Sequence, residues 1–141
     1  MMRFVKLSPT LATAMTPFPY AIDAAASLSE ARTMLTEHGF HHLPVMAGGK
    51  LTGVLRERDV ALVELLDDPS RRVATVQVPA PYVTDIHTPF EQVLDHMETE
   101  GLDVTLVTRN GKLVGIITAT DLARILRRLL TVPIPPENET A

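Results

Sequence analysis

The residues best suited to chemistry in this chain are a threonine and an aspartate, Thr118 and Asp121, which follow the apolar pair Ile116-Ile117. If a strand ends and a helix begins here, the helix N-terminus favours an anion, and the Asp121 carboxylate can accept hydrogen bonds from two sugar hydroxyls. The Thr118 hydroxyl can reach a phosphate or sugar oxygen. The same two side chains can instead cap the helix, and this alternative stays open.

The chain repeats itself at one constant spacing, so the same pattern occurs twice. Glycines, prolines and aspartates match without gaps, as in Pro17 and Pro79, Asp23 and Asp85, Gly39 and Gly101, Gly53 and Gly115, and Asp59 and Asp121. Such matching over a long stretch indicates two copies of one supersecondary unit. We therefore expect an N-terminal segment at 1–11, a first copy at 12–66, a linker at 67–73, a second copy at 74–130 and a Pro-rich, polar tail at 131–141.

The first helix expected in each copy has a recognisable beginning. Ser27 with Glu30, and Thr88 with Glu91, have the spacing of a capping box. Pro89 suits the first helical position, where no amide hydrogen is needed. Apolar residues then recur on one helical face, namely Leu28, Ala31 and Leu35 in the first copy and Phe90, Val93, Leu94 and Met97 in the second.

The remaining elements follow from turn residues and apolar runs. Gly39 and Gly101 are expected to end the helices, and Gly48-Gly49 and Asn110-Gly111 provide the positive φ of tight hairpins. Extended segments are expected at 20–23 and 82–85, hairpin strands at 43–46, 51–55, 104–108 and 113–117, and last helices at about 59–66 and 121–130. The order is strand, helix, strand, strand, helix in each copy, which is an α+β fold.

These copies resemble the repeats of the CBS family. The residues that carry the resemblance are Gly-Phe-His-His-Leu-Pro-Val at 39–45, the runs from glycine to aspartate at 49–59 and 111–121, and Met-Thr-Pro at 15–17. The resemblance covers about residues 10–130. It implies two β-α-β-β-α repeats packed with pseudo-two-fold symmetry and two clefts between them. It also implies a regulatory module, often a disc-shaped homodimer, that acts on an attached or separate enzyme, channel or transporter.

The resemblance further implies a ligand, AMP, ADP or ATP and sometimes S-adenosylmethionine, without any obligatory cofactor. It identifies Ile117, Thr118 and Asp121 with the ribose motif of the family, which has apolar residues, a hydroxyl residue and then an aspartate. The first copy departs from this motif, because Arg56 stands where the hydroxyl is expected, although Asp59 is retained. Arg56 can hold a phosphate, or it can pair with Asp59 and fill the cleft.

Other residues come near a nucleotide by the same resemblance. His41 and His42 begin a strand, so at most one of them can face a given cleft. Their counterparts Asp103 and Val104 carry no positive charge, so the second-copy motif is expected to use basic groups of the first copy. The candidates for an adenine pocket are Tyr20, Phe40, Tyr82 and Leu102. Core packing is the alternative for these four, and a surface or packed position is the alternative for the histidines.

Composition narrows the classes of function. A net charge of −4 and an aromatic content of 4% argue against nucleic acid as a partner. The chain has no cysteine, so disulfides and thiolate metal sites are excluded. No apolar run reaches the roughly 20 residues of a membrane helix, and the start at 1–6 is too short for a signal peptide. We expect a cytoplasmic protein with no membrane partner.

Three kinds of function compete at this point. The first is a regulatory module that senses an adenine nucleotide, and the second is a dimerisation or interaction module whose clefts have degenerated, as Arg56 and Asp103 suggest. An enzyme is disfavoured because no nucleophile and base or paired-carboxylate set stands out. Gly39 interrupts the helical metal spacing of His38, His41 and His42, and the Gly-Gly-Lys at 48–50 lacks the other residues of a phosphate-binding loop.

Overall fold

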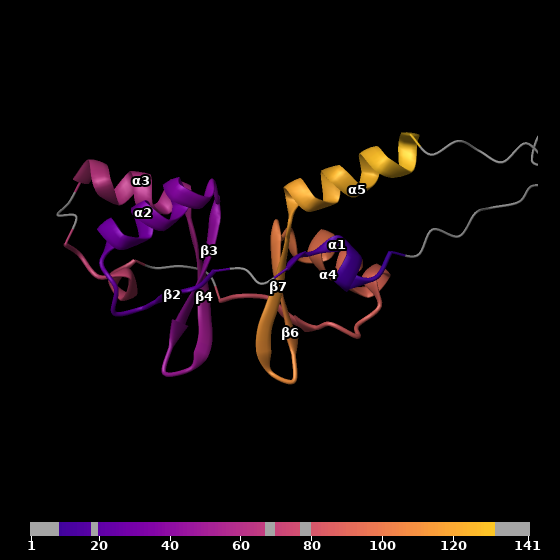
Figure 1. Ribbon diagram of the computed structural model, residues 1–141, viewed down its shortest axis with the longest axis horizontal. Helices are drawn as coiled ribbons and strands as arrows, with labels where there is room; N and C mark the ends of the chain where they lie inside the picture. The colour runs from indigo at the N-terminus through magenta and orange to yellow at the C-terminus, as the bar shows by residue number, and fades with distance from the viewer. Residues whose placement is uncertain (1–8, 18–19, 67–69, 77–79, 132–141) are drawn as a thin grey trace, which may run out of the picture. The chain divides into compact units, whose positions relative to one another are not determined.

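The computed structural model (Figure 1) describes residues 9–17, 20–66, 70–76 and 80–131. It divides into two compact units, here called unit 1 (Met1–Pro17 with Val83–Ala141) and unit 2 (Phe18–Tyr82). Each unit contains a short strand, a helix, a hairpin and a second helix in that order. The predicted α+β fold with two repeats is confirmed. Of the predicted tail at 131–141, only Thr131 lies within the described residues, at the end of the last helix.

Unit 2 is built on a three-stranded sheet with the order β2-β3-β4. The strand β2 (Ile22–Asp23) is parallel to β3 (His42–Ala47), which forms an antiparallel hairpin with β4 (Lys50–Arg56). The helices α2 (Leu28–His38) and α3 (Glu57–Leu66) cover one face of this sheet (Figure 1). The core between the helices and the sheet includes Leu28, Leu35, Leu43, Leu55 and Val60, all almost completely buried.

Unit 1 has a four-stranded sheet with the order β1-β7-β6-β5. The strand β5 (Val83–Asp85) is parallel to β6 (Val104–Arg109), and β6 forms a hairpin with β7 (Lys112–Thr118). The fourth strand, β1 (Thr16–Pro17), comes from the start of the chain and pairs antiparallel with β7. The unit also contains α4 (Phe90–Glu100), α5 (Ala119–Thr131) and the short α1 (Leu11–Ala14).

Each unit is completed by residues at or just before the start of the other sequence repeat. Residues 11–17, which lead into unit 2 along the chain, form α1 and β1 of unit 1. The segment around η1 (Val73–Thr75), which leads towards unit 1, bonds to unit 2, since the Leu28 amide donates to the Arg71 carbonyl at 2.7 Å. The compact units and the sequence repeats therefore have different boundaries.

The turns and helix ends follow the predicted residue chemistry. Gly39 and Gly101 end α2 and α4 in the left-handed conformation, with φ of 66° and 64°. Asn110 and Gly111, with φ of 51° and 76°, make the β6–β7 turn. The Ser27 hydroxyl accepts a hydrogen bond from the Glu30 amide at 3.1 Å, so this half of the predicted capping box is confirmed, and the return bond from the Glu30 side chain is not formed.

The predicted capping box at Thr88 and Glu91 is wrong. The helix α4 begins at Phe90, with Pro89 in the capping position and no side-chain hydrogen bond to the cap. Pro89 is extended, so it precedes the first helical residue instead of occupying that position. Thr88 is drawn into the preceding turn, where its amide donates to the Asp85 carbonyl at 2.9 Å. A residue before proline avoids helical geometry, which separates Thr88 from the helix.

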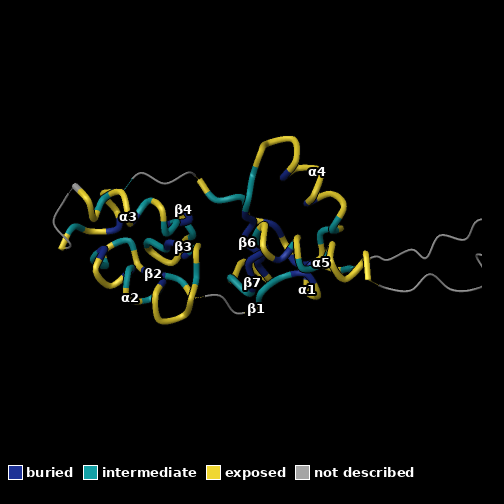
Figure 2. The backbone as a smooth tube through the Cα atoms, turned by 90° about the horizontal axis from the view of Figure 1, so that it is seen from above, coloured by how far each residue is buried: buried dark blue, intermediate teal, exposed yellow. Residues whose placement is uncertain are grey.

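The two first helices bury different shares of their apolar faces. On α2, the predicted residues Leu28, Ala31 and Leu35 are all buried. On α4, only Val93 and Met97 are buried, while Leu94 remains 37% exposed, and Figure 2 shows α4 exposed over most of its length. The apolar stripe of α4 is thus only partly covered within unit 1.

A close contact between β7 and the side chain of Met15, the residue before β1, depends on Gly115. A Cβ atom at this position would overlap the Met15 sulfur and lie 2.8 Å from Met15 Cγ. We expect Gly115→Ala to lower the free energy of unfolding by about 1–3 kcal/mol, because overpacking forces neighbouring side chains to move. Urea denaturation measures this loss. In a Met15→Ala background the added methyl group should cost less, and an equal cost in both backgrounds would contradict the prediction.

Candidate functional site

In each unit the polar candidates lie where the first hairpin strand begins and the second one ends. Val104 pairs with Thr118 in unit 1, and His42 pairs with Arg56 in unit 2. The following helix is tied to the same place, because the Ala119 amide donates to the Asp103 carbonyl at 3.1 Å. The hairpin register thus brings the residues that follow Gly39 close to the start of α3, and those that follow Gly101 close to the start of α5.

Asp121 is the centre of a buried hydrogen-bond network in unit 1. Its side chain is almost fully buried, and it accepts four hydrogen bonds. The oxygen Oδ2 accepts from the Thr118 amide at 2.8 Å and from the Thr118 hydroxyl at 3.2 Å. The oxygen Oδ1 accepts from the Thr16 hydroxyl at 2.9 Å and from Arg124 Nη2 at 2.8 Å. One carboxylate oxygen therefore caps α5, and the other binds β1 and the guanidinium.

Unit 2 repeats the helix cap but with a different residue at its start. The Arg56 amide donates to Asp59 Oδ2 at 3.2 Å, in the same relation as Thr118 and Asp121. The cap uses a backbone amide, so it tolerates arginine in place of threonine. Arg56 and Asp59 are both half-buried.

The adenine-pocket candidates of the first copy are brought together with a residue that the sequence did not assign to that pocket. The Tyr20 ring stacks on His38, with centroids 4.1 Å apart, and lies 5.6 Å from the Phe40 ring. Tyr20 is half-exposed, so its ring is accessible from solvent. The position of His38 one residue before Gly39, and so beside Phe40, is the signal that could have indicated this cluster.

The two histidine candidates have different environments, as strand alternation requires. His41 is exposed, and its Nδ1 lies 3.0 Å from Glu57 Oε2, while Glu57 also bonds to Arg32. The hydrogen bonds from His41 and then Arg32 lower the pKa of Glu57 below its ordinary value. His42 is half-buried and lies opposite Arg56 in the β3–β4 register. His41 thus already has an acidic neighbour in contact with its ring.

The other candidates occupy separate positions. Ile117 is completely buried in β7. Leu102 is half-buried, and its amide donates to the Met97 carbonyl at 2.8 Å, next to the start of β6. Tyr82 is half-buried and directly precedes β5. Within the described residues, no three histidine, aspartate or glutamate side chains gather closely enough to hold a metal ion.

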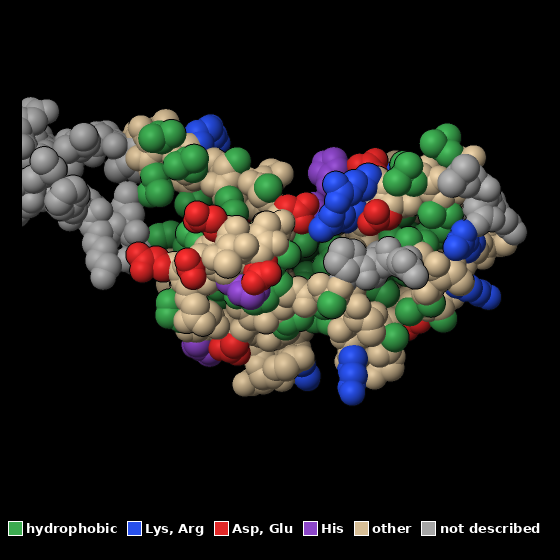
Figure 3. Space-filling view, turned by 180° about the vertical axis from the view of Figure 1, so that it is seen from behind, with side chains coloured by type: hydrophobic (Ala, Val, Ile, Leu, Met, Phe, Trp, Pro, Cys, Tyr) green, Lys and Arg blue, Asp and Glu red, His purple; other side chains and the backbone are tan. Residues whose placement is uncertain are grey.

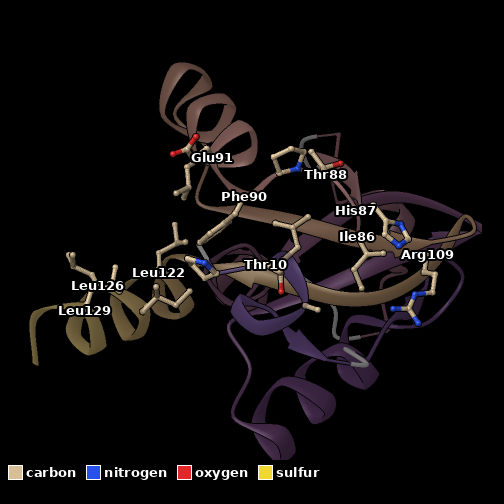
Figure 4. Close-up of a pocket in the computed structure, with 16 residues that line it drawn as sticks. Thr10, Ile86, His87, Thr88, Phe90, Glu91, Arg109, Leu122, Leu126 and Leu129 are labelled. Atoms are coloured by element: carbon tan, nitrogen blue, oxygen red, sulfur yellow. The ribbon is translucent and has the colours of Figure 1, made fainter. Parts of the chain in front are cut away.

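A large apolar groove in unit 1 was not predicted. It has a volume of about 960 Å³ and lies among α1, α4 and α5 (Figure 4). Phe90 and Leu122 lie near its middle, Leu126 and Leu129 at one end, and His87 and Arg109 at the other. The signal in the sequence is the number of leucines on α5, because Leu122, Leu126, Leu129 and Leu130 are more than one core-facing stripe of this helix needs.

The two helices beside this groove carry opposite charges. The residues of α4 include the acids Glu91, Asp95, Glu98 and Glu100, and those of α5 include Arg124, Arg127 and Arg128. The space-filling view shows acidic side chains gathered over α4 and apolar ones along α5 (Figure 3). None of the helices in the part of the chain that the structure describes is long and apolar enough to cross a membrane.

Comparison with known sequences matches both repeats of the chain to one family. A family model described as CBS domain matches residues 11–65 and 73–128. An inosine-5'-monophosphate dehydrogenase of Korarchaeum cryptofilum is 34% identical over 99 residues, which is 68% of this chain and 20% of that protein. The chain spans about a fifth of the length of the first curated relatives that it matches.

Two solved structures show the same fold. The CBS domain pair of protein MJ0100, in complex with 5'-methylthioadenosine and S-adenosyl-L-methionine, has a TM-score of 0.75 and 20% identity, covering 87% of this chain and 99% of that chain. The CBS domain of a bacterial CNNM/CorC family Mg²⁺ transporter, in complex with ATP, has a TM-score of 0.71 and 21% identity, covering 82% and 84%.

The different surroundings of the two capping aspartates lead to a prediction about stability. Asp121→Ala removes the acceptor of four hydrogen bonds and leaves partly buried donors without this partner, so we expect a loss of about 2–4 kcal/mol in the free energy of unfolding. Asp59→Ala removes a half-buried cap and should cost about 1 kcal/mol. Urea denaturation followed by circular dichroism measures both, and equal losses would contradict the prediction.

Proposed function

The chain belongs to the CBS domain family, and on that premise we propose that it binds an adenine nucleotide and regulates a partner protein. The observation that carries the proposal is the pairing of the Thr118 hydroxyl with the Asp121 carboxylate at the start of α5. Two relatives of the same fold hold adenosine ligands, namely ATP in one and S-adenosyl-L-methionine with 5'-methylthioadenosine in the other. Adenosine is the part that these ligands share.

The chemistry of the Asp121 region suits the ribose and the phosphate of such a ligand. A carboxylate oxygen accepts ribose hydroxyls, and the N-terminus of α5 favours a negative charge near Thr118. Arg124 adds a guanidinium that already lies 2.8 Å from Asp121. Half-buried Leu102, next to the start of β6, is our candidate for an apolar contact with the base.

Unit 2 offers a second candidate position with a different character. Arg56 stands in place of the hydroxyl residue, and we propose that its guanidinium binds phosphate. The rings of Tyr20, His38 and Phe40 form a stack whose exposed Tyr20 face suits a planar base. We propose regulation and not catalysis, since the match to the dehydrogenase covers only 20% of that enzyme.

Nucleotide binding is tested by calorimetry with AMP, ADP and ATP. We expect the wild type to bind at least one of them, and we expect Thr118→Val to bind it about tenfold more weakly, because one hydrogen bond to the ligand is lost. Asp121→Ala should abolish binding, provided that circular dichroism shows it folded. Asp95→Ala, an exposed acid on α4, is the matched control and should bind normally.

No binding by the wild type, or equal binding by the wild type and Thr118→Val, would contradict the proposed site.

The apolar groove supports a second role, in dimerisation. We propose that a second copy of the chain fills it with the leucines of its own α5. Leu126, Leu129 and Leu130 are 57%, 38% and 77% exposed, and burying them against another copy removes this apolar surface from water. A two-fold arrangement makes each contact twice, so the acidic α4 of either copy can face the basic α5 of the other.

The dimer is tested by sedimentation equilibrium. We expect the wild type to sediment as a dimer and Leu126→Asp/Leu129→Asp to sediment as a folded monomer, because two carboxylates cannot be buried unpaired in an apolar groove. Leu62→Asp/Leu65→Asp, the same change at exposed positions of α3 outside the groove, is the control and should remain dimeric. A monomeric wild type, or a dimeric Leu126→Asp/Leu129→Asp variant, would contradict the proposal.

A further inference from the structure

The buried carboxylate of Asp121 connects the start of α5 to the start of the chain. Its Oδ1 atom accepts from the Thr16 hydroxyl of β1 at 2.9 Å and from Arg124 Nη2 at 2.8 Å. The same Arg124 nitrogen lies 3.4 Å from the Ala14 carbonyl oxygen at the end of α1. Residues 14–16 are therefore bonded, directly and through Arg124, to the side chain that we propose as the ribose acceptor.

Comparison of the two repeats shows that these bonds are an addition to the helix cap. Both aspartates cap their helices through Oδ2, at 2.8 Å for Asp121 and 3.2 Å for Asp59. The residue of the first repeat that corresponds to Arg124 is Leu62, and the residue that corresponds to Thr16 in the second repeat is Val78. Neither leucine nor valine can donate a hydrogen bond from its side chain. The cap is thus common to both repeats, and the bonds to Oδ1 are specific to Asp121.

Thr16 and a sugar compete for the same atom. A carboxylate oxygen has two lone pairs, and Thr16 with Arg124 uses both on Oδ1. A ribose hydroxyl is chemically equivalent to the threonine hydroxyl, so it can replace Thr16 with little change in the bonding of Asp121. Arg124 can stay, because its charge still balances the carboxylate.

The loss of the Thr16 bond would act on a weakly held strand. β1 has only two residues, Thr16 and Pro17, and it lies at the edge of the sheet next to β7. Pro17 has no amide hydrogen, so it cannot donate a bond to β7. Pro17 is also the last residue of this part of unit 1 before the chain enters unit 2 at position 18. A change in β1 therefore acts at the point where the chain leaves unit 1.

On the basis of the proposed nucleotide site, we infer that Thr16 is a latch that a nucleotide opens. In the free protein the Thr16 hydroxyl occupies the place of a ribose hydroxyl on Asp121 Oδ1. Binding of the nucleotide displaces it, and β1 loosens from β7 while α1 stays anchored by the buried side chains of Leu11 and Ala14. Release of β1 is the signal that the regulated partner detects.

The test compares wild type with Thr16→Val, which removes the competing hydroxyl but keeps the shape of the side chain. We expect Thr16→Val to bind the nucleotide that the wild type binds about tenfold more tightly, since the ligand no longer displaces a hydrogen bond. Thr99→Val, at an exposed position of α4, is the control and should leave affinity unchanged. Hydrogen exchange followed by mass spectrometry should show faster exchange of the amides of residues 14–16 of wild type when AMP or ATP is added.

The possible failures are distinguishable. If the wild type binds nucleotide and Thr118→Val weakens that binding, but Thr16→Val has wild-type affinity or exchange at 14–16 does not change, the latch is wrong and the nucleotide site stands. If neither the wild type nor Thr16→Val binds AMP, ADP or ATP, both inferences are wrong.

Discussion

The turn from the second hairpin strand into the last helix is the constraint on which both repeats depend. In each repeat an aspartate in the first turn of the helix accepts a hydrogen bond from the backbone amide at the end of the strand. A helix start has amides without partners, and this side chain satisfies one of them while fixing the direction in which the helix leaves the sheet. The start of β3 or β6 is tied to the same turn through the helix amides at Glu57 and Ala119. Any ligand chemistry at this place therefore uses side chains that the fold already holds rigid.

Local signals were sufficient to predict most of the fold. Glycine at helix ends, the Asn110-Gly111 turn and the Ser27 cap all act through nearby backbone geometry, so the residues that specify them are close in sequence. The wrong prediction of a cap at Thr88 also comes from a local effect, because the capping-box pattern does not include the effect of Pro89 on the residue before it. The pairing of β1 with β7 could not be predicted from local patterns, since Thr16 and Ile116 are far apart in sequence and two residues are too few to show an alternating pattern.

The candidate site could be predicted only in part for a related reason. The Thr118 and Asp121 pair lies within one turn of helix, so its spacing implied contact. The partners of Oδ1 were not apparent, because Thr16 reaches Asp121 through the strand that residue spacing did not reveal. His38 was considered only as a metal ligand, and its stacking with Tyr20 depends on how the segment before β2 passes the end of α2. The groove of unit 1 was not predicted because the apolar residues of α4 were placed on one helical face and those of α5 were given no role, whereas Leu94 and Leu126 are exposed and both line the groove.

Each unit contains residues from the start of the other sequence repeat, and this limits how the chain can be divided. Residues 11–17 belong to the first sequence repeat but supply an edge strand and a short helix to the unit formed by the second. A gene fragment cut between the repeats would separate β7 from its neighbour β1, and would deprive α2 of the backbone partner that Arg71 gives to Leu28. Each unit therefore folds with residues from outside its own repeat, so the smallest segment that could be duplicated or transferred intact is the pair of repeats.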